Sequence, residues 1–423
     1  MIDEKTLRKI AADYGTPIYI FDEDEVRERA VQIKNILGEN TRLCYSIKAN
    51  PFLIPALMYV VDMFEVCSPG ELSICKEYKV PGEKIIYSGV RKETFDIIDA
   101  IKYDAAILTA ESVRHYELTK EAAKKLNKPV KMILRLSSKS QFGMSAWDIE
   151  EIIKKNRDDD IIEIVGIHYF AGTQRTKLSH QTDELKMLKG TIKGLREKYG
   201  LSLPVLEYGP GLSYPYFVDD PSRPVKEYSD AECSTDNLEP LKMLLDDLTE
   251  ITGDHELTVE MGRFIASSCG YYLTKAVDKK RSFGTNWCIL DGGINHVNYY
   301  GQMMGMKIPE IRILKKETVS EDICTSGNGT DDKGKSDNTK WTLCGSLCTT
   351  NDVLVRDIVM DEPSIGDILV MCNIGAYSVT ESLYLFLSHP MPRVVMKKDD
   401  TYTLVRNFVD TWELNSAAEI PFI

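Results

Sequence analysis

Short apolar runs alternate with longer amphipathic stretches through the first 265 residues or so of the chain. The strand-like runs are 42–48, 64–68, 84–88, 105–109, 130–137, 161–170, 205–209 and 257–261. The helix-like stretches between them include 51–60, 70–78, 112–126, 145–155, 178–199 and 236–252. Alternating strands and helices are typical of a parallel sheet with right-handed crossovers. Eight such units predict an α/β fold, a closed (β/α)8 barrel of the TIM type.

An open, doubly wound sheet is the alternative that this pattern leaves. Such a sheet usually carries a glycine-rich turn after its first strand, where it binds a dinucleotide. Here the first strand is followed by the run Lys48-Ala-Asn-Pro51. The sequence therefore favours the closed barrel.

The pattern changes after about residue 270, where long helical stretches become rare. The strand-like runs there are Trp287–Asp291, Trp341–Gly345, Asp367–Cys372, Arg393–Lys397 and Tyr402–Arg406. We expect a barrel over 25–270 and a second, mainly β domain formed by 1–24 and 271–423. Residues 316–340 are rich in Lys, Thr, Ser, Gly, Asn and Asp, which is typical of a mobile surface insertion.

The composition narrows the functional classes. The 423 residues carry a formal net charge of -13, which argues against a nucleic-acid or anionic-membrane partner. No export signal opens the chain and no apolar run is long enough for a membrane span, so we expect a cytoplasmic protein. The ten cysteines are scattered without a Cys-x-x-Cys pair, and no metal site is predicted.

The first strand ends in Lys48, within the apolar run Leu43-Cys-Tyr-Ser-Ile-Lys48. Chemistry in such barrels gathers at the C-terminal ends of the strands. A single lysine is usually a surface residue, but a lysine on a strand that is otherwise buried needs a reason. Covalent attachment of a carbonyl cofactor through a Schiff base is one such reason.

Other strand ends carry polar or small residues that each have a structural and a functional interpretation. Ser68 either caps a helix or binds a cofactor, and His168 and Phe170 are either core residues or cofactor contacts. Gly209 and Gly211 form either a tight turn or a phosphate nest. Glu260 and Arg263 form either a local ion pair or a grip on a ring nitrogen and a phosphate. Together, an amine, a carboxylate, a phosphate nest and an aromatic platform are what pyridoxal phosphate requires.

These motifs resemble the fold-type III pyridoxal-phosphate decarboxylases, which include diaminopimelate, ornithine and arginine decarboxylases and share their barrel with alanine racemase. The resemblance runs from Tyr14-Gly-Thr-Pro-Ile-Tyr19 past Gly375-Ala-Tyr377. It implies that Lys48 holds pyridoxal 5'-phosphate, that Glu260 faces the pyridine nitrogen, and that Arg263, Gly209, Gly211 and Tyr377 lie near the phosphate. It further implies a homodimer with shared sites, because Cys344–Asp352 matches a segment that reaches into the partner's site. Cys348 in that segment is the expected proton donor.

Three departures from the family pattern bear on the substrate. Pro210 replaces the central glycine of the phosphate loop and removes one N–H group. Phe170 stands where the family stacks a histidine on the cofactor, while His168 lies two residues earlier. Thr349 follows Cys348, where diaminopimelate and ornithine decarboxylases have an acid that grips the distal ammonium of the substrate. We expect Thr349 and Asp352 to contact the substrate.

The motifs His168-Tyr-Phe-Ala-Gly-Thr-Gln174, Cys348-Thr-Thr-Asn-Asp352 and Phe386-Leu-Ser-His-Pro390 are similar to a branch found in antibiotic and siderophore pathways. That branch includes the butirosin-pathway decarboxylase of carrier-protein-bound glutamate. The resemblance therefore implies a small-molecule or carrier-protein-bound amino-acid substrate. The alternatives are a decarboxylase of free diaminopimelate, ornithine or lysine, an amino-acid racemase, a non-catalytic regulator that binds the cofactor, and a metal-dependent barrel hydrolase.

Overall fold

A computed structural model of the chain describes residues 2–157, 159–228, 238–252, 255–301, 305–317 and 339–416. The chain divides into two compact units. The barrel unit comprises Asp24–Tyr214 and Asp236–Ala266, and the sheet unit comprises Met1–Glu23, Pro215–Thr235 and Ser267–Ile423. The described part of 215–235 thus belongs with the sheet unit, whereas the sequence pattern placed this segment inside the barrel.

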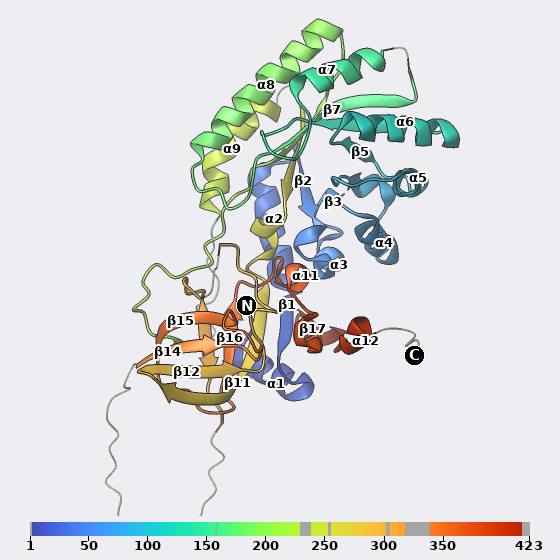
Figure 1. The fold of residues 1–423 in the computed structure, drawn as a ribbon. Helices are drawn as coiled ribbons and strands as arrows, with labels where there is room; N and C mark the ends of the chain where they lie inside the picture. Colours follow the sequence, from blue (N-terminus) through green and yellow to red (C-terminus); the bar gives the residue numbers. More distant parts are fainter. Residues whose placement is uncertain are drawn as a thin grey trace, which may run out of the picture. The chain divides into compact units, whose positions relative to one another are not determined.

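Eight parallel strands close into a barrel, which confirms the fold predicted from the pattern (Figure 1). Their order around the barrel is β10-β2-β3-β4-β5-β6-β7-β8. The strands are β2 (Thr41–Ser46), β3 (Met63–Val66), β4 (Ile85–Tyr87), β5 (Ile107–Ala110), β6 (Val130–Arg135), β7 (Ile162–Phe170), β8 (Val205–Gly209) and β10 (Glu256–Met261).

Helices alternate with the barrel strands; the first precedes β2, the last follows β10, and the others lie between successive strands. They are α2 (Glu23–Leu37), α3 (Ile54–Leu57), α4 (Pro69–Glu77), α5 (Thr94–Lys102), α6 (Val113–Leu126), α7 (Ala146–Lys155), α8 (Ser179–Tyr199), α9 (Glu239–Thr252) and the short α10 (Arg263–Ala266). Serine side chains start three of them: Ser68, Ser112 and Ser145 each accept a backbone N–H from the first turn of the helix that follows.

The barrel interior consists of two layers with opposite chemistry. The apolar floor is formed by one inward residue from each of seven strands: Cys44, Met63, Ile86, Ile107, Ile133, Val165 and Val205. Two positions farther along most of these strands, the next inward residues are polar. This polar layer consists of Ser46, Glu65, Ser88, Thr109, Arg135, His168, Glu207 and Glu260, all of them buried.

Strand β7 departs from the two-residue spacing. The register between β6 and β7 shifts, so that Met132 pairs with Ile164 but Ile133 pairs with Gly166, and Val165 is an extra residue. This β-bulge pairs His168 with Arg135 and so brings His168 into the polar layer. A side chain at Gly166 would lie 1.9 Å from the carbonyl oxygen of Val205, so only glycine fits at this place.

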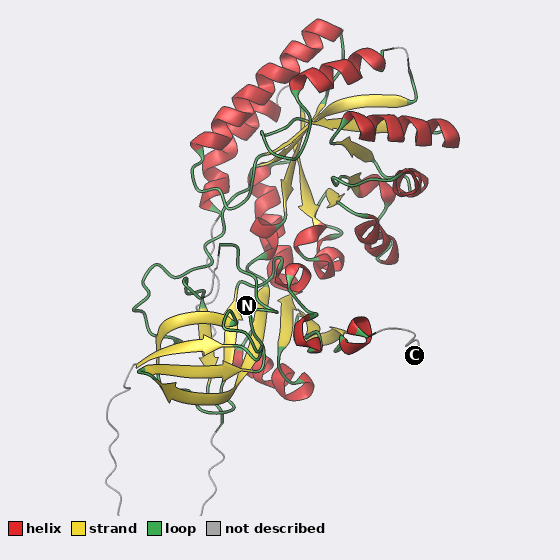
Figure 2. Cartoon of the chain, viewed as in Figure 1, coloured by secondary structure: helices red, strands yellow, loops and turns green. Residues whose placement is uncertain are grey.

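The sheet unit is built on a ten-stranded sheet, as expected for a mainly β domain (Figure 2). The strands are β1 (Ile18–Asp22), β9 (Lys226–Glu227), β11 (Gly270–Ser282), β12 (Thr285–Leu290), β13 (Ile311–Leu314), β14 (Thr339–Cys344), β15 (Val353–Met360), β16 (Ile368–Cys372), β17 (Arg393–Lys398) and β18 (Thr401–Arg406). The main path runs β15-β14-β12-β11-β1-β17-β18, while β16 and β13 extend from β11 and β9 pairs with β13.

The sheet unit also contains helices. The helix α1 (Glu4–Tyr14) packs Leu7 and Ile10 into the apolar core of the sheet, and α11 (Ser378–Glu381) and α12 (Trp412–Asn415) follow β16 and β18. Most of the predicted insertion 316–340 lies outside the described residues, because 318–338 are not described.

Candidate active site

Lys48 lies at the C-terminal end of β2, in a short 3-10 turn (Ile47–Ala49) that follows the strand. Its ammonium donates to Glu65 Oε2 at 2.7 Å and to Glu260 Oε1 at 3.4 Å. The thiol of Cys67 lies 3.8 Å from the same nitrogen. The side chain is 38% exposed although its charged end faces two buried carboxylates. An amine in this position is both reachable and held in place, as a nucleophile toward a carbonyl cofactor has to be.

Glu260 is the most heavily engaged carboxylate of the polar layer. Its Oε1 accepts from the Ser46 hydroxyl at 2.8 Å, and its Oε2 lies 3.3 Å from His168 Nε2. Burial opposes ionisation of Glu260, but the Lys48 charge and the adjacent His168 side chain outweigh it. Together they hold the pKa of this carboxyl well below its usual value. Glu260 is thus a buried carboxylate that stays charged, as the predicted partner of a protonated ring nitrogen would.

The predicted phosphate loop follows β8 and packs against the segment after β7. A side chain at Gly209 would lie 2.5 Å from the Phe170 ring, and one at Gly211 would lie 1.8 Å from the carbonyl oxygen of Gly172. Gly211 also has a φ of +60°, a conformation that favours glycine. Glycine is therefore required at Gly211, and a side chain at Gly209 would displace the Phe170 ring, which lies directly against the loop.

Residues outside this loop hold it in place through hydrogen bonds, although Pro210 lacks the N–H group that a glycine would provide. Gln181 Nε2 donates to Pro210 O at 3.1 Å, and the backbone N–H of Arg175 donates to Gly211 O at 2.9 Å. Arg263 begins α10, is buried, and donates to the Thr173 hydroxyl at 3.3 Å. The cationic side chain and the glycine loop thus both adjoin the segment after β7, as expected for residues that share one phosphate.

Ser68 caps a helix, which is one of the two roles that the sequence allowed. Its hydroxyl oxygen accepts the N–H of Glu71 at 3.1 Å and so caps α4. The carboxylate of Glu71 in turn accepts the N–H of Cys67 at 2.7 Å. These two hydrogen bonds fix the turn after β3. The cofactor contact of Ser68 stays a prediction.

A second charged cluster lies at the ends of β4, β5 and β6. Arg135 donates to Glu111 at 2.7 Å, and both side chains are buried. Lys92 is also buried and donates to the Gly89 carbonyl oxygen, and burial lowers the pKa of this lysine to about 8. The negative charges of Glu111 and Glu65 act in the opposite direction. This cluster adds positive charge close to the Lys48 site.

The segment that carries Cys348 and Thr349 belongs to the sheet unit and follows β14. Cys348 is exposed, and the Thr349 hydroxyl accepts the N–H of Asn351 at 3.3 Å. Asp352 is buried, and its two carboxylate oxygens accept the N–H groups of Ile294 and Leu347, each at 2.8 Å. Asp352 was expected to contact the substrate. In the structure its oxygens are engaged by backbone of the same unit, and the residue fixes the loop that presents Cys348 and Thr349.

Tyr377 lies in the sheet unit immediately before α11. Its φ is +68°, and its carbonyl oxygen accepts the N–H groups of Thr380 and Glu381. A tyrosine in the left-handed region is uncommon, and such residues concentrate at functional sites. Its predicted contact with the phosphate stays a prediction.

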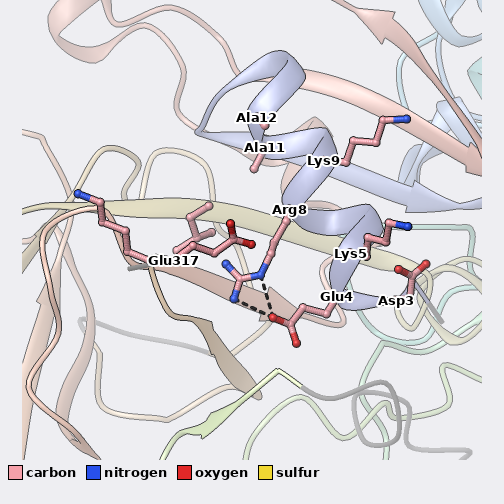
Figure 3. A pocket seen from close by; sticks show the side chains of 10 residues that line it. Asp3, Glu4, Lys5, Arg8, Lys9, Ala11, Ala12 and Glu317 are labelled. Carbon is pink, nitrogen blue, oxygen red and sulfur yellow. Dashed lines mark hydrogen bonds and ion pairs between the residues drawn. The ribbon is translucent and has the colours of Figure 1, made fainter. Parts of the chain in front are cut away.

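A groove of about 930 Å³ in the sheet unit does not coincide with any of the predicted site residues (Figure 3). It runs along α1, where Arg8 forms an ion pair with Glu4 at 2.7 Å. The groove is lined by Asp3, Glu4, Lys5, Arg8, Lys9, Ala11, Ala12, Lys316, Glu317 and Ile368. Charges of both signs on flexible side chains line it, and none of the barrel residues discussed above contributes to it.

Sequence reasoning missed several residues of the polar layer and its surroundings. Glu65, Arg135 and Glu207 were not among the predicted site residues, nor were Lys92 and Glu111. A signal for the first three was present, because each is an ionisable residue inside a short apolar strand. The inward phase of each strand, read from the apolar floor, would have placed Glu65, Arg135 and Glu207 in the barrel interior.

Comparison with known proteins agrees with this geometry. Residues 23–267 match the profile of the pyridoxal-dependent decarboxylases, over their pyridoxal-binding domain. The chain belongs to this family. It is a pyridoxal-phosphate-dependent amino-acid decarboxylase, and its barrel is the fold-type III barrel. Within the described residues, no helix is both long and apolar enough to cross a membrane.

Three curated relatives are each 25% identical to the chain. The L-glutamyl-[BtrI acyl-carrier protein] decarboxylase of Niallia circulans aligns over 96% of this chain and 94% of its own length. The diaminopimelate decarboxylase of Methanocaldococcus jannaschii aligns over 96% and 91%. The 2-[(L-alanin-3-ylcarbamoyl)methyl]-2-hydroxybutanedioate decarboxylase of Staphylococcus aureus aligns over 89% and 93%.

Solved structures show the same fold. The diaminopimelate decarboxylase of M. jannaschii in complex with L-lysine superposes with a TM-score of 0.80 at 22% identity, covering 98% of this chain and 94% of that one. A lysine/ornithine decarboxylase of Vibrio vulnificus in complex with cadaverine gives 0.74 at 20% identity, with 94% and 96% covered.

Proposed function

We propose that this decarboxylase acts on an amino acid that is already joined to another group, either a small-molecule conjugate or a carrier-protein-bound amino acid in a secondary-metabolite pathway. The observation that carries the proposal is Thr349, which stands directly after Cys348 where an acid is expected for a diamine-type substrate. A threonine hydroxyl cannot form the charge-assisted contact that holds a free distal ammonium. In the structure this hydroxyl accepts a hydrogen bond within its own loop.

The names of two relatives support this substrate class. One acts on an L-glutamyl group on an acyl-carrier protein, and the other on an alanin-3-yl group joined through a carbamoyl linkage. In both, the part of the substrate beyond the amino acid is a linkage rather than a free ammonium. A relative of equal identity acts on diaminopimelate, so the choice between the classes depends on Thr349.

The barrel residues would divide the work of decarboxylation among them. Pyridoxal phosphate, when bound, supplies an electron sink for the charge left at the substrate Cα after CO2 departs. Lys48 supplies the amine that holds the cofactor and later helps to release the product. Glu260, charged in its buried position, keeps the proton at the pyridine nitrogen. Arg263 and the backbone of Gly209–Gly211 would bind the phosphate group, and the Phe170 ring would stack on the cofactor face.

Protonation at Cα is assigned to Cys348 of a second copy of the chain, within a homodimer with shared sites. Cys348 is exposed on a loop that the buried Asp352 carboxylate holds in shape, so its thiol is available to a site outside its own unit. Mixing Lys48→Ala subunits with Cys348→Ala subunits tests this arrangement. We expect part of the activity to return in the mixture, because some dimers then contain one intact site.

The substrate class is tested by measuring CO2 release from two panels. One holds free diaminopimelate, ornithine, lysine and arginine, and the other holds amino acids joined through the side chain to an amide or to a pantetheine thioester. We expect kcat/KM for at least one conjugate to exceed that for every free amino acid by about 10²-fold or more. Brisk turnover of any one free amino acid in the first panel would contradict the proposal.

A further inference from the structure

Glu207 is a buried acid for which the reaction described above has no use. It lies on β8 at the level of the polar layer, paired in register with His168 on β7 and Thr258 on β10. Its side chain is fully buried, and among the described residues neither of its carboxylate oxygens has a hydrogen-bond partner. A charged carboxylate in such surroundings would be very costly, so Glu207 needs either a partner or a proton.

A second carboxylate lies close to Glu207. One side-chain nitrogen or oxygen atom from each of His168, Glu207 and Glu260 lies within 4.8 Å of those of the other two. The other ionisable groups that act on Glu207 are Lys48 after β2, Glu65 on β3 and Arg135 on β6, and Cys44 on β2 is affected by Glu207 in turn. Two carboxyl groups this close in a water-poor interior do not both ionise, because the second charge would be repelled by the first.

The contacts decide which of the two carries the proton. Glu260 has the Lys48 ammonium at 3.4 Å, the Ser46 hydroxyl at 2.8 Å and His168 Nε2 at 3.3 Å, all of which stabilise a negative charge. Glu207 has no such contact with any residue that the structure describes. We propose that Glu207 and Glu260 form a coupled pair that shares one proton, with the proton on Glu207 and the charge on Glu260. Glu207 is then a positioning residue, which acts through Glu260.

The directions of the two pKa shifts agree with this assignment. Burial, and after it the charge of Glu260, raises the pKa of Glu207 well above its usual value. The pKa of Glu260 is held well below its usual value, as described above. The pair therefore keeps the charge of Glu260 beside Lys48, and Glu207 adds no further negative charge to the polar layer.

The proposal assumes the orientation of Glu260 toward the cofactor described above, but the shared proton is a property of the chain itself. The proton is detected by infrared difference spectroscopy, in which the spectrum of a variant is subtracted from that of the unmodified full-length protein. The comparison is made on the protein as purified with its cofactor and again after the cofactor is removed. We expect a carbonyl band of a protonated carboxylic acid at neutral pH in both forms. Glu207→Gln, which keeps the shape but cannot hold the proton, should abolish this band.

Two matched substitutions serve as controls. Glu163→Gln removes an exposed carboxylate from β7, and Glu71→Gln removes a partly buried acid whose pKa is also raised by burial. The band should remain with both. Persistence of the band in Glu207→Gln, or its absence from the unmodified protein, would overturn the proposal. These outcomes do not depend on the substrate, so they are separate from a failure of the proposed function.

Coupling is tested by following the same band with pH in Glu260→Gln. Removing the neighbouring charge should lower the pH at which Glu207 releases its proton by about one unit or more. An unchanged midpoint would show that the two groups titrate independently and would overturn the coupling. If Glu260→Gln does not fold, Ser46→Ala replaces it. Loss of that hydrogen bond should shift part of the proton to Glu260 and split the band in two, and a single unchanged band would contradict coupling.

Discussion

The apolar floor and the polar layer of the barrel are built largely from the same strands, about two residues apart, yet the two layers have different roles. The floor groups small and medium apolar side chains from seven strands, each at most 6% exposed. The polar layer is buried to the same extent but includes three glutamates, an arginine and a histidine. Burial of apolar groups stabilises the fold, whereas burial of charges costs free energy unless each is paired.

The difference shows where the barrel is optimised for stability and where for chemistry. Glu65 and Glu260 are paired with Lys48, and Arg135 is paired with Glu111. Glu207 has no such pair within the described part of the chain and is proposed to carry a proton instead. Substitutions in the floor should therefore change the free energy of unfolding, and substitutions in or around the polar layer should change catalysis and pH dependence.

The largest effect is expected from Lys48→Ala. Activity should fall at least about 10³-fold, because the amine that attaches the cofactor and helps to release the product is lost. The absorption band of lysine-bound cofactor should disappear as well, which a spectrum of the purified protein checks. Lys131→Ala removes an exposed lysine from β6 and should leave both activity and spectrum intact. Retention of the cofactor band in Lys48→Ala would contradict the assignment.

The floor is tested by Ile133→Ala. Deleting this fully buried side chain should lower the free energy of unfolding by about 2–5 kcal/mol, while kcat per folded molecule stays near the original value. Ile107→Val removes less volume from the same layer and should cost about 0.5–1.5 kcal/mol. Urea unfolding and active-site titration measure the two quantities. A large loss of kcat with unchanged stability would show that the two layers do not divide their roles.

Substrate choice depends on a loop outside both layers, which Thr349→Glu tests. An acid at this position should raise kcat/KM for free diaminopimelate or lysine by about tenfold or more, because it supplies the charge-assisted contact that is missing. Thr349→Gln has a similar size without the charge and should not show the gain. A rise with Gln equal to that with Glu would mean that size and not charge sets the preference.

The smallest effect concerns pH and Lys92. The pKa of Lys92 is lowered to about 8 in the folded chain, against an ordinary value of 10.5. Between these pH values the unfolded chain binds the extra proton, so the free energy of unfolding should rise with pH by on the order of 1 kcal/mol per unit from this group. Lys92→Met should lack that rise, and the difference between the two unfolding curves isolates it. Parallel curves over this pH range would contradict a buried, easily deprotonated lysine.

The fold was accessible from sequence because its signals are local. Each of the eight predicted barrel strands overlaps an observed one, from β2 to β10, since each strand is a short apolar run between turn residues. That the described part of 215–235 belongs with the sheet unit could not be recovered in this way. The described part of that segment includes β9, whose partner β13 lies more than eighty residues farther along the chain.

The candidate site was only partly accessible from sequence. Lys48 and Glu260 stood out because they interrupt apolar strands and match a family motif, and the structure brings them together. The structural role of Asp352 could not be read from sequence, because the hydrogen bond that it accepts from Ile294 joins residues 58 positions apart. Its contact with the substrate stays a prediction. Glu207 was overlooked because a carboxyl group beside a glycine-rich turn attracts less notice than the turn itself.

The extra residue in β7 has a consequence for how such barrels acquire new chemistry. Counting by twos from Val165 would place Ile167 in the barrel interior, and the histidine would face the helices. The extra residue shifts the inward and outward positions of β7 by one, so that His168 faces the interior in place of Ile167. Gly166 makes this shift possible, and the other strands keep their own alternation. Insertion of a single residue into one strand is thus a route by which a barrel gains an ionisable group at its centre. Searches for buried catalytic residues should allow for both phases wherever a glycine interrupts a strand.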